Sequence, residues 1–284
     1  MQLILINHGH NPKCEEYLLK AAKKRKLETK IVSTQKNIFE ITTAKPLSKT
    51  LLYRIAIERS EATLERIYLT RGAVGFSEEG QYSKRITNKL VRYMDFEKAG
   101  VPIPPTIFSN STSSENLKKI AQKLGLPLVI KTLDGSKGEG TLVVDSFFAL
   151  KSTVPLLVGQ ELEFVFQKMI REAAGRHVRV IVLGGKIVCA YQKSIPKKID
   201  FRSNATDKAR RKIVHLDAQT ENFVLKAVAA SGVSFGGVDL LPTKKGYLIT
   251  EVNSPCNFAA SQDFTGIDIA GLMLDFLIAK AQRK

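Results

Sequence analysis

The chain alternates short apolar runs with amphipathic segments, which is the pattern of a protein built from strands and helices. Residues 3–6 form an uninterrupted apolar run typical of a buried strand. Asn11 followed by Pro12 is typical of a helix N-cap and first helical residue, and the apolar positions that follow are spaced for one helix face. Residues 30–33 resemble a second strand. The opening segment therefore predicts a small βαβ unit.

The loop after the first predicted strand reads Asn-His-Gly-His, which is not the Gly-x-Gly-x-x-Gly pattern of a dinucleotide site. His8 and His10 project to the same side if the strand continues through them. Two histidines alone are a weak indication of a metal site, and polar loop residues are the favoured interpretation.

A second group of elements begins near residue 85. Residues 90–96 have the spacing of an amphipathic helix, and a proline-rich connection follows. Residues 112–115 read Thr-Ser-Ser-Glu, a capping box that predicts another helix, which Gly125 ends. Residues 126–131 and 141–144 then predict two strands.

The loop between those two strands is rich in glycine, and the strand before it ends at Lys131. Glycine allows backbone N–H groups to approach an anion closely. The loop is not a Walker A sequence, because no Gly-Lys-Ser/Thr precedes a helix. A lysine before a flexible glycine hairpin suits a lid over a triphosphate, and a solvent-exposed glycine turn is the alternative.

Near the end of the chain, residues 237–241 and 247–253 are apolar strand-like runs on either side of Lys-Lys-Gly. A three-residue hairpin loop favours glycine at its left-handed position, so residues 244–246 are expected to form the turn. Pro242 cannot donate to a strand ladder and is expected at an edge or at the end of its strand.

This hairpin carries the candidate chemistry. Pairing Thr243 with Tyr247 sets Asp239 opposite Glu251, and Asn253 shares their face because side chains two apart point the same way. Three hard oxygen ligands at one end of a hairpin suit Mg²⁺, which keeps water and phosphate oxygens in its other positions. A hairpin with polar ends is the alternative at this point.

Composition limits the possibilities without choosing among them. A chain of 284 residues with 44% apolar content can bury a large core divided among two or three subdomains. No apolar run reaches about 18 residues and the start lacks a basic leader, so we expect a cytoplasmic protein. Lys and Arg outnumber Asp and Glu by 44 to 27, and the resulting charge of +17 attracts polyanions. The three cysteines, Cys14, Cys189 and Cys256, have no metal-binding spacing and are expected to be reduced and structural.

The chain carries, in order, Lys131, the loop 134–140, Gln-Lys-Met-Ile at 167–170, Arg179, Asp-Phe-Arg-Ser-Asn at 200–204, Asp239, Glu-Val-Asn at 251–253 and Thr-Gly-Ile-Asp-Ile-Ala at 265–270. This order is similar to that of the ATP-grasp superfamily, and most closely to that of RimK-type carboxylate–amine (alpha-L-glutamate) ligases. The resemblance covers roughly residues 85 to 280.

The resemblance implies an α/β and α+β protein with the ATP-grasp fold, in which two α+β subdomains sandwich ATP, preceded by a small Rossmann-like α/β domain. The expected division is an N-terminal domain over 1–85, a lid subdomain over 86–168 and a C-terminal subdomain with the magnesium site over 169–284.

The resemblance also implies roles for individual residues. Asp239, Glu251 and Asn253 would hold Mg²⁺, with Mn²⁺ as a substitute, and Arg202, Asn204 and Arg179 would be catalytic. The residues expected to contact ATP are Lys89, Lys131, Gly135, Ser136, Gly138, Gly140, Lys168, Met169, Ile170, His177, Arg202, Ser203 and Asn204.

The sequence departs from the family pattern in three places. Lys168 stands where an acidic residue is usual, and His177 replaces the acid that commonly holds the ribose hydroxyls. Residues 254–258 read Ser-Pro-Cys-Asn-Phe instead of beginning Ala-Ser-Pro-Gly, in the segment that faces the carboxylate and amine in relatives. A different substrate is therefore plausible. Cys256 has no neighbour in sequence that marks it as a nucleophile, so a packing role is favoured.

Two functions follow from the resemblance. The first is a ligase that uses ATP and an acyl phosphate to add an amino acid, such as glutamate, to an anionic acceptor: a small molecule, a peptide or a protein terminus. The second is a noncatalytic nucleotide-binding adaptor that binds RNA or the ribosome through its basic surface. An adaptor has no need for the three metal ligands, so the enzyme is favoured. We expect no membrane partner, nucleic acid is a less favoured partner, and a homo-oligomer is possible.

Overall fold

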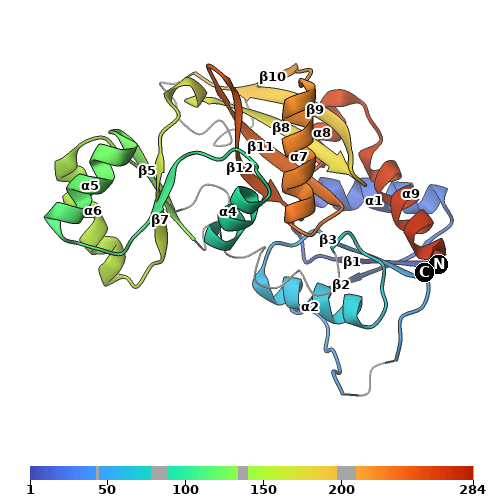
Figure 1. Cartoon of the computed structure of the whole chain (residues 1–284). Helices are drawn as coiled ribbons and strands as arrows, with labels where there is room; N and C mark the ends of the chain where they lie inside the picture. Colours follow the sequence, from blue (N-terminus) through green and yellow to red (C-terminus); the bar gives the residue numbers. More distant parts are fainter. Residues whose placement is uncertain (43–44, 78–88, 134–139, 197–208, 284) are drawn as a thin grey trace.

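The computed structural model describes residues 1–42, 45–77, 89–133, 140–196 and 209–283. The strands fall into three sheets, and most helices cover the faces of these sheets (Figure 1). Gly135, Ser136, Gly138, Arg202, Ser203 and Asn204 lie outside the described residues.

The first sheet has three parallel strands in the order β2-β1-β3. Its elements are β1 (Gln2–Ile6), β2 (Glu28–Val32) and β3 (Thr50–Arg54), with helices α1 (Pro12–Lys24) and α2 (Arg59–Thr70). The central strand β1 is almost entirely buried, as its apolar run predicts. Asn11 does occupy the N-cap of α1, but with a left-handed backbone and no side-chain capping bond.

The second sheet has four antiparallel strands in the order β4-β7-β5-β6. Its elements are β4 (Thr106–Phe108), β5 (Leu128–Thr132), β6 (Thr141–Val144), β7 (Phe164–Lys168), α5 (Ser114–Leu124) and α6 (Phe147–Gly159). The capping box is displaced by one residue, because Ser113 and not Thr112 is the N-cap and accepts from Asn116 N. Apolar side chains of α5 and α6 pack on one face of this sheet.

The third sheet has five antiparallel strands in the order β10-β9-β8-β11-β12. Its elements are β8 (Arg176–Leu183), β9 (Lys186–Ser194), β10 (Arg210–Ile213), β11 (Phe235–Thr243) and β12 (Gly246–Asn253), with α7 (Ala218–Ala230), α8 (Ala259–Thr265), α9 (Ile269–Gln282) and the short helix η1 (Arg171–Ala173). Alternate residues of β8 join different cores, since Val178, Val180 and Val182 pack with α7 whereas Ile181 and Leu183 pack toward α1 and α9. Both faces of this sheet are therefore covered.

The two ends of the chain pack together (Figure 1). Helix α9 lies against α1, and Arg25 Nε donates to Asp275 Oδ1 at 2.7 Å. The last helices thus share a core with the first sheet, and the division at residues 85 and 168 stays a prediction. None of the helices in the described part of the chain has the length and apolar character needed to cross a membrane.

Candidate active site

The turn between β11 and β12 differs from the sequence prediction. Thr243 pairs with Gly246 and Pro242 pairs with Tyr247, so the loop holds two residues, 244 and 245, and not three. The expected pairing of Thr243 with Tyr247 is therefore wrong. Thr243 Oγ1 explains part of this choice, because it donates to Gly246 O at 3.0 Å and accepts from the backbone of the loop.

A bulge in β12 nevertheless restores the predicted pairing of the acidic residues. The register shifts at Thr250, whose hydroxyl donates to Asp239 O at 3.1 Å. Beyond the bulge, Asp239 faces Glu251 and Gly237 faces Asn253. A bulge places two residues of one strand opposite one of its partner, which compensates for the one-residue error at the turn.

The three predicted metal ligands lie together and are bonded to one another. Asn253 Nδ2 donates to Asp239 Oδ2 at 3.1 Å and to Glu251 Oε1 at 3.0 Å. Asp239 is buried, and the other two side chains are partly exposed. A single amide thus holds two carboxylates within reach of one ion, and carboxylate and amide oxygens are the donors that Mg²⁺ accepts.

Arg179 lies beside this group on the neighbouring strand β8, directly opposite Asp239. Its guanidinium donates from Nε to Asp239 Oδ1 at 2.7 Å and from Nη2 to Asp239 Oδ2 at 3.0 Å. Burial disfavours the charged form, but the charge of Asp239 outweighs it and the pKa of Arg179 is raised. Arg179 therefore keeps its charge and orients Asp239 through a bidentate pair.

His177 lies two residues before Arg179 on β8, with Nε2 3.7 Å from Asp239 Oδ1. Burial, and then the positive charges of Arg179 and Lys193, lower the pKa of His177 to about 3. The imidazole is therefore neutral near pH 7, and it can donate a hydrogen bond to a hydroxyl or accept one from it without adding charge.

Helix α4 (Lys89–Lys98) joins the four-stranded sheet to this hairpin. Lys89 Nζ donates to Thr132 O at 2.7 Å, at the end of β5. One turn later, Arg92 Nη1 donates to Val252 O at 2.8 Å, between Glu251 and Asn253. Lys89 is among the residues expected to contact ATP and Arg92 is not, although a spacing of three residues puts both on one helix face.

Lys131 is half-buried on β5, opposite Thr141 on β6 and Val165 on β7. Gly140 closes the return to β6 with a left-handed φ of 74°, and its carbonyl accepts from Thr132 N at 2.9 Å. A Cβ at Gly140 would lie 2.0 Å from Thr132 Oγ1, so this position requires glycine.

Lys168, Met169 and Ile170 leave the end of β7. Lys168 N donates to Pro105 O at 2.9 Å, and because proline has no N–H, the opposite residue cannot bond back to the Lys168 carbonyl. The Ile170 carbonyl accepts from Ala173 N, whereas the Ile170 N–H takes no part in this turn. Among the described residues, the Lys168 carbonyl thus receives no bond from the residue opposite it, and the Ile170 N–H is not used in the turn that follows.

Cys256 is packed beneath the site. It is 3% exposed, and its Sγ lies 3.9 Å from Arg179 Nη1. Burial raises the pKa of Cys256 to about 12, more than the nearby guanidinium lowers it. A Cβ at Gly237 would lie 2.7 Å from this sulfur, so the thiol fills space against the strand. These contacts fit the packing role expected from the sequence.

Comparison with known proteins gives a consistent match. The family model of the RimK-like ATP-grasp domain matches residues 87–277. A probable alpha-L-glutamate ligase of Coxiella burnetii is 26% identical over 296 residues, covering 99% of this chain and 97% of the relative. The ATP-grasp ligase PsnB, solved with a minimal precursor, Mg and ADP, superposes with a TM-score of 0.76 at 18% identity and covers 98% of this chain and 97% of its own. The D-alanine–D-alanine ligase of Bacillus anthracis has a TM-score of 0.75 at 17% identity, with 100% and 98% covered.

Proposed function

This chain belongs to the RimK-like ATP-grasp family, has the ATP-grasp fold and is an ATP-dependent ligase, and from that premise we propose the reaction that its site performs. The acceptor carboxylate attacks the γ-phosphorus of ATP and ADP leaves. An amino acid amine then attacks the resulting acyl phosphate, so that phosphate and a proton leave and an amide forms. The observation that carries the proposal is the bonded group of Asp239, Glu251 and Asn253.

Mg²⁺ fits this group because its members offer only oxygen donors and one amide already holds both carboxylates. When bound, the ion neutralises charge on the phosphate oxygens. The pairing with Arg179 offsets part of the negative charge of Asp239 and fixes the direction of its carboxylate. Catalysis then consists chiefly of positioning and charge neutralisation, which is what phosphoryl transfer requires.

Several cationic side chains serve the nucleotide and the acceptor in this proposal. Lys131, on β5, and Lys89, which bonds the Thr132 carbonyl at the end of that strand, bind phosphate oxygens as point charges. Arg202 and Asn204, which lie outside the described residues, steady the transferring phosphoryl group. Arg179 holds the metal ligand Asp239, and its role in catalysis is therefore through that carboxylate.

The adenine pairs with the backbone at the end of β7. The Lys168 carbonyl accepts from the exocyclic amine and the Ile170 N–H donates to the ring, while Met169 lies between them. Support comes from Pro105, which lies opposite Lys168 and has no N–H to donate to the Lys168 carbonyl. His177, as a neutral imidazole, bonds a ribose hydroxyl.

The acceptor is anionic, and the added amino acid is glutamate or a similar residue. The net charge of +17 attracts acidic molecules. The relative from Coxiella burnetii is named a probable alpha-L-glutamate ligase, and the PsnB structure contains a precursor. An acidic peptide or protein terminus is therefore a better candidate than a neutral small molecule.

The test is an assay of nucleotide products with pooled amino acids and acidic peptides, with the amide product identified by mass. We expect ADP and phosphate that depend on both substrates, and a KM for the acceptor that rises with ionic strength. Formation of AMP would contradict the acyl phosphate route. A KM that is independent of salt would contradict an anionic acceptor.

A further inference from the structure

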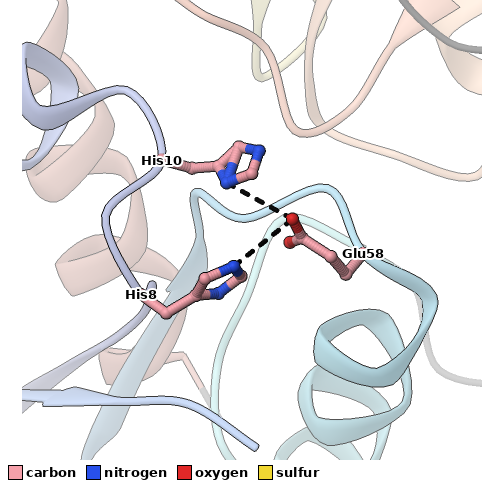
Figure 2. A group of neighbouring side chains, drawn as sticks. All are labelled: His8, His10 and Glu58. Atoms are coloured by element: carbon pink, nitrogen blue, oxygen red, sulfur yellow. Dashed lines mark ion pairs between the residues drawn. The ribbon is translucent and has the colours of Figure 1, made fainter. Parts of the chain in front are cut away.

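The loop after β1 meets the start of α2 in a second cluster of metal-ligating side chains, outside the residues that the family model matches. Figure 2 shows the imidazoles of His8 and His10 converging on the carboxylate of Glu58. His8 Nε2 and His10 Nδ1 each lie 3.3 Å from the same atom, Glu58 Oε1. From this geometry we propose that His8, His10 and Glu58 bind a divalent transition metal ion of the zinc class.

The distances fit tetrahedral coordination. Two ligands bonded to a tetrahedral zinc ion at about 2.0–2.1 Å lie about 3.3–3.4 Å apart. The two observed N–O distances of 3.3 Å match that edge and are longer than the usual N–H···O hydrogen bond of about 2.9–3.0 Å. One ligand atom from each of the three residues lies within 4.8 Å of the others, so a small adjustment brings all three to bonding distance.

The loop that carries the histidines is fixed by a buried residue. Asn7 is 1% exposed, accepts from His10 N at 3.0 Å and donates to His10 O at 2.9 Å and to Glu15 Oε2 at 2.7 Å. Glu58 is held as the N-cap residue of α2, with its carbonyl accepting from Ala62 N. The backbone that carries the histidines and the backbone that carries Glu58 are therefore both fixed before any ion binds.

A second carboxylate supports the assignment. Glu61 is fully buried, and its Oε1 accepts from Thr34 N and Oγ1 at 2.9 and 2.8 Å. The same oxygen lies 3.7 Å from His8 Nδ1, a buried nitrogen with no hydrogen bond in the described structure. A metal on Nε2 leaves the proton on Nδ1, facing Glu61. This is the carboxylate–histidine–metal arrangement that orients ligating imidazoles.

The donor set selects the metal. Two imidazole nitrogens and one carboxylate oxygen suit zinc and its neighbours, whereas Mg²⁺ prefers oxygen donors alone. The Asp239 group and this cluster therefore bind different ions. His10 and Glu58 are partly exposed, so the fourth position of a tetrahedral ion faces water or an exchangeable ligand.

The test uses the full chain, freed of metal by a chelator and titrated with Co²⁺ and then Zn²⁺. We expect the strong visible absorption of tetrahedral Co²⁺, its loss on adding one equivalent of Zn²⁺, and a higher melting temperature with Zn²⁺. His8→Gln, His10→Gln and Glu58→Gln should each weaken binding at least about tenfold, with circular dichroism confirming that each variant folds.

Two controls make the result decisive. His215→Gln changes an exposed histidine elsewhere, and Glu251→Gln changes the magnesium site, so both should show the tetrahedral Co²⁺ absorption of the parent chain. The proposal is overturned if Co²⁺ shows only weak octahedral absorption, if the three ligand variants bind normally, or if Glu251→Gln abolishes the signal. The experiment measures no ligase activity, and its result is therefore separate from that of the proposed function.

Discussion

The buried pair of Arg179 and Asp239 predicts a large and non-additive effect on stability. The side chains are 12% and 5% exposed, and two hydrogen bonds join them. Replacing Arg179 with Met leaves the carboxylate of Asp239 buried without its main counter-charge. We expect Arg179→Met to lower the free energy of unfolding by about 3–5 kcal/mol, and Asp239→Asn to do so by a similar amount.

The double variant separates this pair from simple loss of packing. With both charges removed, the double variant Arg179→Met/Asp239→Asn should lose about 2–3 kcal/mol less free energy of unfolding than the two single variants lose in sum. Arg179→Lys keeps the charge but cannot make both hydrogen bonds of the guanidinium, so its free energy of unfolding should lie between those of the parent and Arg179→Met. The chain has no tryptophan, so unfolding in urea is followed by circular dichroism.

A surface pair gives the matched control. Lys119 Nζ bonds Glu115 Oε1 at 2.7 Å, and the two side chains are 61% and 78% exposed. Lys119→Met should therefore cost no more than about 1 kcal/mol. The reasoning is refuted if Arg179→Met costs as little as Lys119→Met, or if the two single effects at Arg179 and Asp239 add to within about 0.5 kcal/mol.

Three further predictions concern the hairpin, the thiols and the nucleotide. Gly140→Ala should destabilise the protein by at least about 1–2 kcal/mol, since φ is 74° and the new Cβ meets Thr132; urea unfolding measures this. Burial raises the pKa of Cys256 to about 12 and the pKa of Cys189 to about 11, so both thiols stay protonated at pH 8. A disulfide reagent should therefore label them only after denaturation, and rapid labelling of the native protein would contradict this. Pro105→Ala adds an N–H opposite the Lys168 carbonyl and should weaken ATP binding about fivefold, as measured by calorimetry, whereas unchanged affinity would argue against this base-binding edge.

That Asp239, Glu251 and Asn253 share one end of a hairpin could be predicted, because side chains two apart in a strand point the same way. The turn could not. A glycine three residues after Thr243 favours a three-residue loop, yet Thr243 bonds across to Gly246, and a bulge at Thr250 absorbs the difference. Two local errors of one residue cancelled, because the buried face of the sheet fixes which side chains point inward.

Contacts between segments far apart in the sequence could not be predicted. Arg92 reaches the backbone of β12 across 160 residues. The resemblance implies a catalytic role for Arg179, but no residue near it in the sequence indicates that Asp239 is its partner. Two histidines alone are a weak indication of a metal site, and Glu58, which the fold places beside His8 and His10, is far from them in the sequence. Such contacts depend on how three sheets pack together, which residue spacing does not report.

The central claim is that the oxygen ligands on the β11–β12 hairpin make this chain an ATP-consuming ligase, and Glu251→Gln tests it most directly. Glu251 is partly exposed, so the variant should fold as the parent does. Formation of ADP and amide product should fall at least about 100-fold, since the metal site loses one of its two negative charges. Glu221→Gln, an exposed acid on α7, should retain full activity. Turnover by folded Glu251→Gln that matches Glu221→Gln would contradict the account.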